Sequence, residues 1–324
     1  MIGLLLLIFV VSASVGRFQI TPGTVVRLFF VRLSGAPVPP SLEQASLVLF
    51  RIRVPRLLGA ALVGSALAAS GAAYQGLFQN PLVSPDVLGV SAGASFGAVL
   101  SLFWGFPPMG LVLVSFTFGL GTALLVKLLA RKVGQGSNLA LVLSGILVGS
   151  LFTSATSLLK LVADPANVLP ALTYWLMGGL STIKEAHLLV AGPTILLSLG
   201  LLVALRWRIN LLTMGEEEAR TLGAQVPLSR TLVILAATLA TGASVAISGP
   251  IGWVGLVIPH FARMVAGSDY RKLLPASLLL GASFLMLVDD FSRMLTTSEI
   301  PIGILTSFVG VPVFLLLIRR GGAR

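Results

Sequence analysis

Apolar segments of membrane-spanning length recur along almost the whole chain, and they restrict its fold more than any other feature. A helix that crosses the hydrocarbon core of a bilayer needs about 20 mostly apolar residues. On that rule the sequence predicts spans near 1–16, 57–78, 87–105, 109–130, 139–162, 188–206, 229–249, 252–266, 274–294 and 303–319. We therefore expect one all-α polytopic membrane domain over residues 1–324, with about ten transmembrane helices and a short eighth segment.

The composition argues against several other classes of protein. Hydrophobic residues make up 56% of the chain and charged residues only 10%, so the main surroundings are a lipid bilayer and no segment offers a soluble domain. The net charge of +11 does not indicate nucleic-acid binding, because the basic residues gather at the ends of the apolar segments. With no cysteine in the chain, there is no disulfide, thiolate nucleophile or iron–sulfur ligand. We expect no metal site.

The distribution of basic residues predicts an orientation in the membrane. An even number of spans places both termini on one side, and that side collects the larger share of lysine and arginine, so we expect both termini in the cytoplasm and the protein in the cell inner membrane. The arginines between Arg17 and Arg56 are the main exceptions. The first apolar run, Met1 to Gly16, lacks a basic leader, so we interpret it as a short first span rather than a secretory signal.

Two outer segments lie between the predicted spans. The stretch 17–56 holds Pro22, Pro37, Pro39 and Pro40 without a clean period, so we expect an irregular outer loop there. The stretch 164–185 contains Trp175, and we expect a short interfacial helix in it.

Small residues recur at every fourth position on either side of a polar turn. This spacing places them on one helix face, where they let two membrane helices approach closely. The stripe before the turn includes Gly64 and Ala68, and the one after it comprises Gly89, Gly93 and Gly97. Either stripe alone predicts only helix packing.

The segment 213–223 predicts a short surface helix between the sixth and seventh spans. Thr213 and Glu216 have the spacing of a capping box, three glutamates complement the positive helix end, and Gly223 suits a C-terminal cap. The helix is either a solvated connector or a docking helix for a partner. The sequence contains no G-x-x-x-x-G-K-[ST] loop, so ATP and Mg²⁺ would have to be bound by a separate ATPase chain.

Three signatures resemble one family of membrane permeases. They are QNPLVSPDVLGVSAGA at 79–94, GPIGWVGLVIPH at 249–260 and EIPIGILTSFVGVP at 299–312. From about Arg51 to the C-terminus the chain resembles the FecCD/BtuC-type permeases of the ATP-driven importers for iron-siderophores, haem and vitamin B12. It departs from that pattern at Trp253, where phenylalanine is usual, and at Tyr270, where histidine is common.

The resemblance implies a BtuC-like type II importer permease and assigns roles to particular residues. It implies a homodimer with two ATPase subunits and one extracytoplasmic substrate-binding protein. The implied contacts with the ATPase lie on the coupling helix at Gly215, Glu216, Glu217, Glu218, Ala219, Leu222 and Gly223. Those with the binding protein lie at Arg53, Arg56 and Arg293, and the implied cytoplasmic gate lies at Ser137 and Asn138.

The resemblance also indicates the class of substrate. The S-P-D-x-L-G-V-S-x-G-A form resembles iron-siderophore permeases slightly more than those for haem or vitamin B12, which remain alternatives together with molybdate. We expect no enzyme chemistry in this chain. The rival from another class is an ion-coupled secondary carrier using Asp289 and Asp290, because intramembrane carboxylates are functional candidates. An ion pair between Asp289 and Arg293, four residues apart on one helix, is the simpler account.

Overall fold

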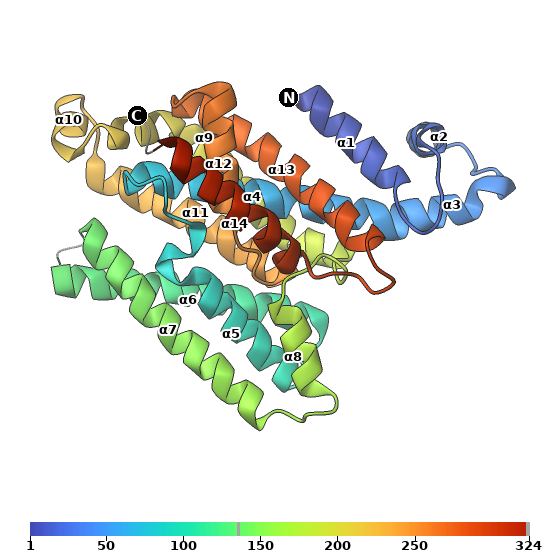
Figure 1. The fold of residues 1–324 in the computed structure, drawn as a ribbon, viewed down its shortest axis with the longest axis horizontal. Helices are drawn as coiled ribbons and strands as arrows, with labels where there is room; N and C mark the ends of the chain where they lie inside the picture. Colours follow the sequence, from blue (N-terminus) through green and yellow to red (C-terminus); the bar gives the residue numbers. More distant parts are fainter. Residues whose placement is uncertain (135–136, 322–324) are drawn as a thin grey trace.

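The computed structural model describes residues 1–134 and 137–321, and this part of the chain is a bundle of helices without a strand (Figure 1). The helices of the first half are α1 (Ile2–Ser14), α2 (Pro22–Ser34), α3 (Glu43–Leu47), α4 (Val54–Leu77), α5 (Val90–Phe103), α6 (Pro108–Gly134) and α7 (Asn138–Val162). Those of the second half are α8 (Val168–Leu176), α9 (Glu185–Thr213), α10 (Glu216–Thr221), α11 (Val226–Ser248), α12 (Val254–Ala266), α13 (Tyr270–Met294) and α14 (Ile302–Gly321).

Ten apolar helices coincide with the ten predicted spans. Six are long and apolar enough to cross a membrane: α6, α7, α9, α11, α13 and the continuous helical stretch Pro40–Leu77 that contains α4. The other four, α1, α5, α12 and α14, have shorter apolar stretches. A short 3₁₀ helix, Pro85–Leu88, precedes α5, and its Pro85 and Leu88 side chains are buried.

The prediction of an irregular outer loop over 17–56 is wrong, because most of this stretch is helical. Thr21 caps α2 by accepting a hydrogen bond from the backbone N–H of Thr24, and Gly35 ends the helix in the left-handed conformation. A 3₁₀ turn, α3 and a π-helical turn over Val48–Arg53 then run into α4 without a break. The predicted short helix within 164–185 is confirmed as α8, and its interfacial position stays a prediction.

Helix α4 occupies the middle of the bundle and packs against α9, α11, α12 and α13. Most of its side chains are small and buried, so neighbouring backbones approach it closely. A Cβ atom at Gly64 would lie 2.2 Å from the carbonyl oxygen of Gly281 in α13. A Cβ atom at Gly71 would lie 1.8 Å from the carbonyl oxygen of Gly255 in α12. The stripe that includes Gly64 and Ala68 is therefore a contact surface for α13.

The second stripe packs α5 against α6 and α7. Gly89 precedes α5 with φ of 68°, and a Cβ atom there would lie 2.8 Å from the carbonyl oxygen of Gly145 in α7. Gly93 lies against Thr122, and Gly97 lies against the backbone of α6. The two stripes thus contact different neighbours.

Candidate functional site

The short helix α10 lies between α9 and α11 at one end of the bundle, called here the α10 end (Figure 1). Gly215 precedes it with φ of 117° and Gly223 follows it with φ of 82°, conformations that favour glycine. The predicted cap by Thr213 is wrong, because Thr213 is the last residue of α9 and its hydroxyl donates to the Asn210 carbonyl at 2.6 Å. A residue with helical backbone does not take the extended conformation of an N-cap.

Helix α10 presents charged and apolar side chains to the outside. Ala219 is its buried contact, while Glu217 and Glu218 are exposed. The flanking side chains of Met214 and Leu222 are 62% and 59% exposed. A short helix with acidic and apolar exposed side chains offers a surface on which a partner can dock. The coupling role that the resemblance implies for 215–223 stays a prediction.

One guanidinium joins α10 to the start of α7. Arg230, in the first turns of α11, places Nη1 2.5 Å from Oε1 of Glu216. Its Nη2 donates to the side-chain oxygen of Asn138, the first residue of α7. The Arg230 side chain is only 17% exposed, whereas that of Glu216 is 51% exposed. The contact with Asn138 is therefore partly buried, and the contact with Glu216 lies at the surface. The predicted coupling helix and the predicted gate turn are therefore connected through Arg230.

The predicted gate turn is partly outside the described residues, since 135–136 lie in it. Ser137 is the N-cap of α7, and its hydroxyl accepts from the backbone N–H of Ala140 at 3.2 Å. Both Ser137 and Asn138 thus have structural contacts. Their role as a gate stays a prediction.

Charged side chains gather at the opposite, α2 end of the bundle, where α1, α4 and α13 meet. Arg56 in α4 places Nε 2.8 Å from Oδ1 of Asp289 in α13 and Nη1 2.8 Å from Oε1 of Glu299. The side chains of Arg56 and Asp289 are 9% and 0% exposed. This pair is therefore an interior contact between two helices rather than a surface ion pair.

The two remaining arginines predicted to dock the binding protein also have partners within the chain. Arg53 donates from Nη1 to the carbonyls of Ala13 at 2.6 Å and Ser14 at 3.0 Å. Arg293 forms an ion pair with Asp289 at 3.1 Å and a second one with Asp290. The structure thus places all three arginines in contacts that hold the α2 end together. Their docking role stays a prediction.

The same contacts account for the two aspartates in the ninth span. The predicted ion pair of Asp289 with Arg293 is confirmed. Asp290 pairs with Arg293 and accepts from the Ser12 hydroxyl at 2.5 Å. Each carboxylate is thus compensated by arginine, and an intramembrane carboxylate paired in this way needs no transported cation to balance its charge. This geometry disfavours the ion-coupled carrier.

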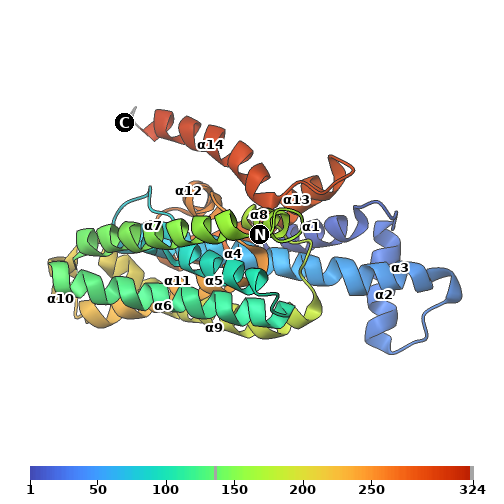
Figure 2. The ribbon, with the colours of Figure 1, turned by 90° about the horizontal axis from the view of Figure 1, so that it is seen from below.

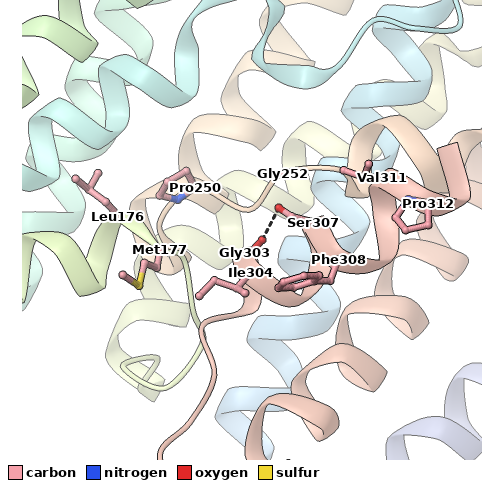
Figure 3. Close-up of a pocket in the computed structure, with 10 residues that line it drawn as sticks. All are labelled: Leu176, Met177, Pro250, Gly252, Gly303, Ile304, Ser307, Phe308, Val311 and Pro312. Atoms are coloured by element: carbon pink, nitrogen blue, oxygen red, sulfur yellow. Dashed lines mark hydrogen bonds between the residues drawn. The ribbon is translucent and has the colours of Figure 1, made fainter. Parts of the chain in front are cut away.

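An apolar groove of about 730 Å³ separates α14 from the bundle (Figure 3). In Figure 2 α14 stands out from the other helices. The groove is lined from α14 and from the turns that follow α8 and α11, by Leu176, Met177, Pro250, Gly252, Gly303, Ile304, Ser307, Phe308, Val311 and Pro312.

Comparison with known proteins identifies the family. A model of the FecCD transport family matches residues 4–320. This chain belongs to the FecCD transport family. It is therefore the permease of an ATP-binding-cassette importer, a transport subunit and a multi-pass protein of the inner membrane.

Relatives and a solved structure cover nearly the whole chain. The molybdate import system permease protein MolB of Haemophilus influenzae is 40% identical over 98% of this chain and 95% of its own length. A probable iron chelatin transport system permease protein of Helicobacter pylori is 39% identical over 86% of this chain and 84% of its own. A solved inward-facing structure of a metal-chelate type ABC transporter has a TM-score of 0.87 at 39% identity, covering 98% of this chain and 97% of that one. The predicted BtuC-like permease fold is confirmed.

Two residues of these sites escaped the sequence analysis. Arg230 carries no local motif, and its partners Glu216 and Asn138 lie 14 and 92 residues away. Glu299 was noted only as part of a signature, although it shares Arg56 with Asp289. Only the folded chain brings these charges together.

Proposed function

We propose that this permease imports an iron chelate of the siderophore type, delivered by a soluble binding protein and driven by a separate ATPase. One observation carries the proposal: the chain matches a metal-chelate type transporter over 98% of its length. The relative named for iron chelatin transport supports the same class of substrate. Haem and vitamin B12 remain within this class of bulky, metal-bearing cargo.

Molybdate is the second candidate substrate. The alignment with this chain covers 95% of the relative named for molybdate import, and 84% of the relative named for iron chelatin transport. The two candidates differ strongly in size, because molybdate is a small oxyanion and an iron-siderophore is a bulky chelate. A transport assay with both substrates separates them.

The proposed assembly has this chain as one of two copies, with an ATPase subunit at each α10 and one binding protein at the α2 end. ATP and Mg²⁺ belong to the ATPase. The basic residues at the α10 end, including Lys127, Arg131 and Arg271, support a cytoplasmic position for that end. Both termini then lie in the cytoplasm.

Docking of the binding protein is proposed to involve Arg53, Arg56 and Arg293, as the resemblance implies. Because these arginines already hold carboxylates and carbonyls of this chain, acidic groups of the binding protein would compete with those internal partners. Arg293→Gln should slow association in low salt. Unchanged association of the folded variant would reject a docking role for Arg293.

The Arg230 contacts support a mechanical role for α10. ATP binding and hydrolysis would displace α10, and Glu216 would transmit that displacement through Arg230 to Asn138 and α7. The pathway between the two copies would then open towards one side of the membrane at a time.

The deciding experiment is gentle purification of the native chain from its own membranes, followed by transport in vesicles. We expect an ATPase subunit to co-purify in equal amount, and uptake of a labelled ferric siderophore to require ATP and to survive an ionophore. Molybdate uptake without siderophore uptake would establish the second substrate. If the chain came out alone and uptake stopped when the ion gradient collapsed, the ATP-driven proposal would be overturned.

A further inference from the structure

A basic pocket of about 330 Å³ lies at the α10 end, between the last turns of α6, the first turns of α7 and α11, and α10 itself. Figures 1 and 2 show these elements together at one end of the bundle. Four of its lining side chains are cationic and one is acidic. The lining comprises Lys127, Arg131, Leu141, Glu216, Arg220, Val226, Pro227, Arg230, Thr231 and Ile234.

The positive charge of this pocket is not balanced within the described part of the chain. Glu216 is shared by Arg230 at 2.5 Å and Arg220 at 3.7 Å. Lys127 and Arg131 form no ion pair with any described residue. They lie one turn apart on α6, where like charges repel.

The C-terminal end of α6 explains only part of this arrangement. Cations in the last turn of a helix are favoured by the helix dipole, which accounts for Arg131 but not for Lys127. It does not account for Arg220 and Arg230, which reach the same pocket from α10 and α11. Arginine and lysine side chains form strong, charge-assisted hydrogen bonds with phosphate, so a pocket that gathers four of them from three helices suits a phosphate group.

Apolar surface adjoins the pocket and indicates where the rest of the ligand would lie. Leu124 and Leu128 of α6, in the same two turns as Lys127 and Arg131, are 54% and 58% exposed. Within the pocket, Leu141 and Ile234 add apolar wall beside the cations. A charged site bordered by exposed leucines on a membrane helix suits a phosphate that carries acyl chains better than a free anion.

We propose that this basic pocket binds the phosphate group of an anionic phospholipid from the adjoining leaflet, with the acyl chains along Leu124 and Leu128. Basic pockets between transmembrane helices bind such headgroups in other membrane proteins. The proposal goes beyond the transport function and does not depend on which substrate is carried. Glu216 and Arg230 line the pocket, so a phosphate bound there would lie beside the side chains that connect α10 to α7.

Native mass spectrometry of the purified full chain in detergent tests the proposal. Cardiolipin, phosphatidylglycerol and phosphatidylcholine are titrated separately onto the wild type, the Lys127→Gln/Arg131→Gln variant and the Lys272→Gln control. Lys272 is exposed on the first turn of α13, outside the pocket. We expect the anionic lipids to bind more tightly than phosphatidylcholine, and the double variant to bind them about tenfold or more weakly. The Lys272→Gln control should bind them as the wild type does.

Two further arms make the result decisive. Arg131→Lys keeps the charge, so it should keep lipid binding; this variant guards against loss through misfolding, which thermal unfolding of each variant also checks. Inorganic phosphate at millimolar concentration should not displace the lipid. If inorganic phosphate displaced the lipid, the pocket would be a site for free oxyanions. If all three lipids bound equally, the pocket would not be a site for anionic lipids. Either outcome overturns the proposal.

Discussion

Arg56 and Asp289 form an ion pair inside the bundle, with Nε of the arginine 2.8 Å from Oδ1 of the aspartate and both side chains almost fully shielded from solvent. The two residues are 233 positions apart, and their contact joins the central helix α4 to α13. Breaking one partner of a buried pair is costly, because the other charge is left in a medium of low dielectric constant.

Replacing Arg56 by methionine should therefore destabilise the protein by about 3–5 kcal/mol. The change leaves Glu299 without its arginine and Asp289 with Arg293 alone. Chemical unfolding in detergent micelles measures the loss. Arg51→Met is the matched control, because Arg51 is exposed one turn earlier. Equal stability of the two variants would contradict an energetic role for the pair.

Gly64→Ala should destabilise the contact between α4 and α13. The added Cβ would lie 2.2 Å from the Gly281 carbonyl oxygen, so two helix backbones must separate. We expect a loss of about 1–3 kcal/mol, as for other overpacked interiors. Gly200→Ala in α9 is the control, because nothing lies within 4 Å of its built Cβ. A loss in the control as large as that at Gly64 would show that the close approach is not the cause.

Arg230→Gln should uncouple transport from ATP hydrolysis. Without the guanidinium, Glu216 and Asn138 lose their common partner, so displacement of α10 no longer moves α7. In vesicles containing the whole transporter, we expect uptake per ATP hydrolysed to fall about tenfold. Arg208→Gln, at an exposed position of α9, should leave the ratio unchanged. An unchanged ratio in Arg230→Gln would remove this residue from the mechanism.

The hydrogen bonds of Asp269 predict that the folded protein loses stability in acid. It caps α13 by accepting from the Arg271 backbone N–H at 2.9 Å, and the Asn210 amide donates to it at 2.5 Å. The Arg271 backbone hydrogen bond, followed by that from Asn210, holds the pKa of Asp269 below its ordinary value. The carboxylate therefore stabilises the folded state above its unfolded pKa of about 4, and this contribution is lost as the pH falls through the lower, folded pKa.

Thermal unfolding between pH 7 and pH 3 checks this prediction. Asp269→Ala should be less stable than the wild type at pH 7, and the difference should shrink towards pH 3 as the wild-type carboxylate is protonated. Glu43→Ala, at an exposed position of α3, is the control. A difference between Asp269→Ala and wild type that stays constant with pH would argue against the charged cap.

The groove beneath α14 predicts where a second copy packs. Phe308 in this groove is 75% exposed, whereas Leu189 of α9, 70% exposed, lies on a helix at the other side of the bundle (Figure 2). In a two-fold dimer the same surface of both copies meets. Because the chain has no cysteine, Phe308→Cys should give a dimer with a bifunctional maleimide in membranes, and Leu189→Cys should not. Cross-linking of Leu189→Cys alone would place the interface elsewhere.

The sequence predicted the helices well where the signal was local. Ten apolar segments became ten helices, since the length of an apolar run and its flanking charges act within one segment. The outer stretch 17–56 was misread, although Thr21, Pro22 and Gly35 carry the cap signals of a helix. In the sequence, the prolines of this stretch favour a loop, and that prediction conflicts with the cap signals. Thr213 shows the opposite error. Its spacing from Glu216 predicts a helix cap, but Thr213 is the last residue of α9.

By itself the sequence determined that this protein is a bundle of membrane helices, because hydrophobicity and small-residue spacing are properties of short segments. The resemblance to the FecCD type rests on the three signatures, which are also local. Only the tertiary structure decided that Arg56 meets Asp289, that Arg230 joins Glu216 to Asn138, and that four cations share a pocket. The physical reason is that a charge has no local pattern that names its partner. Helix packing brings distant segments together, and the low dielectric constant between them makes those pairings matter.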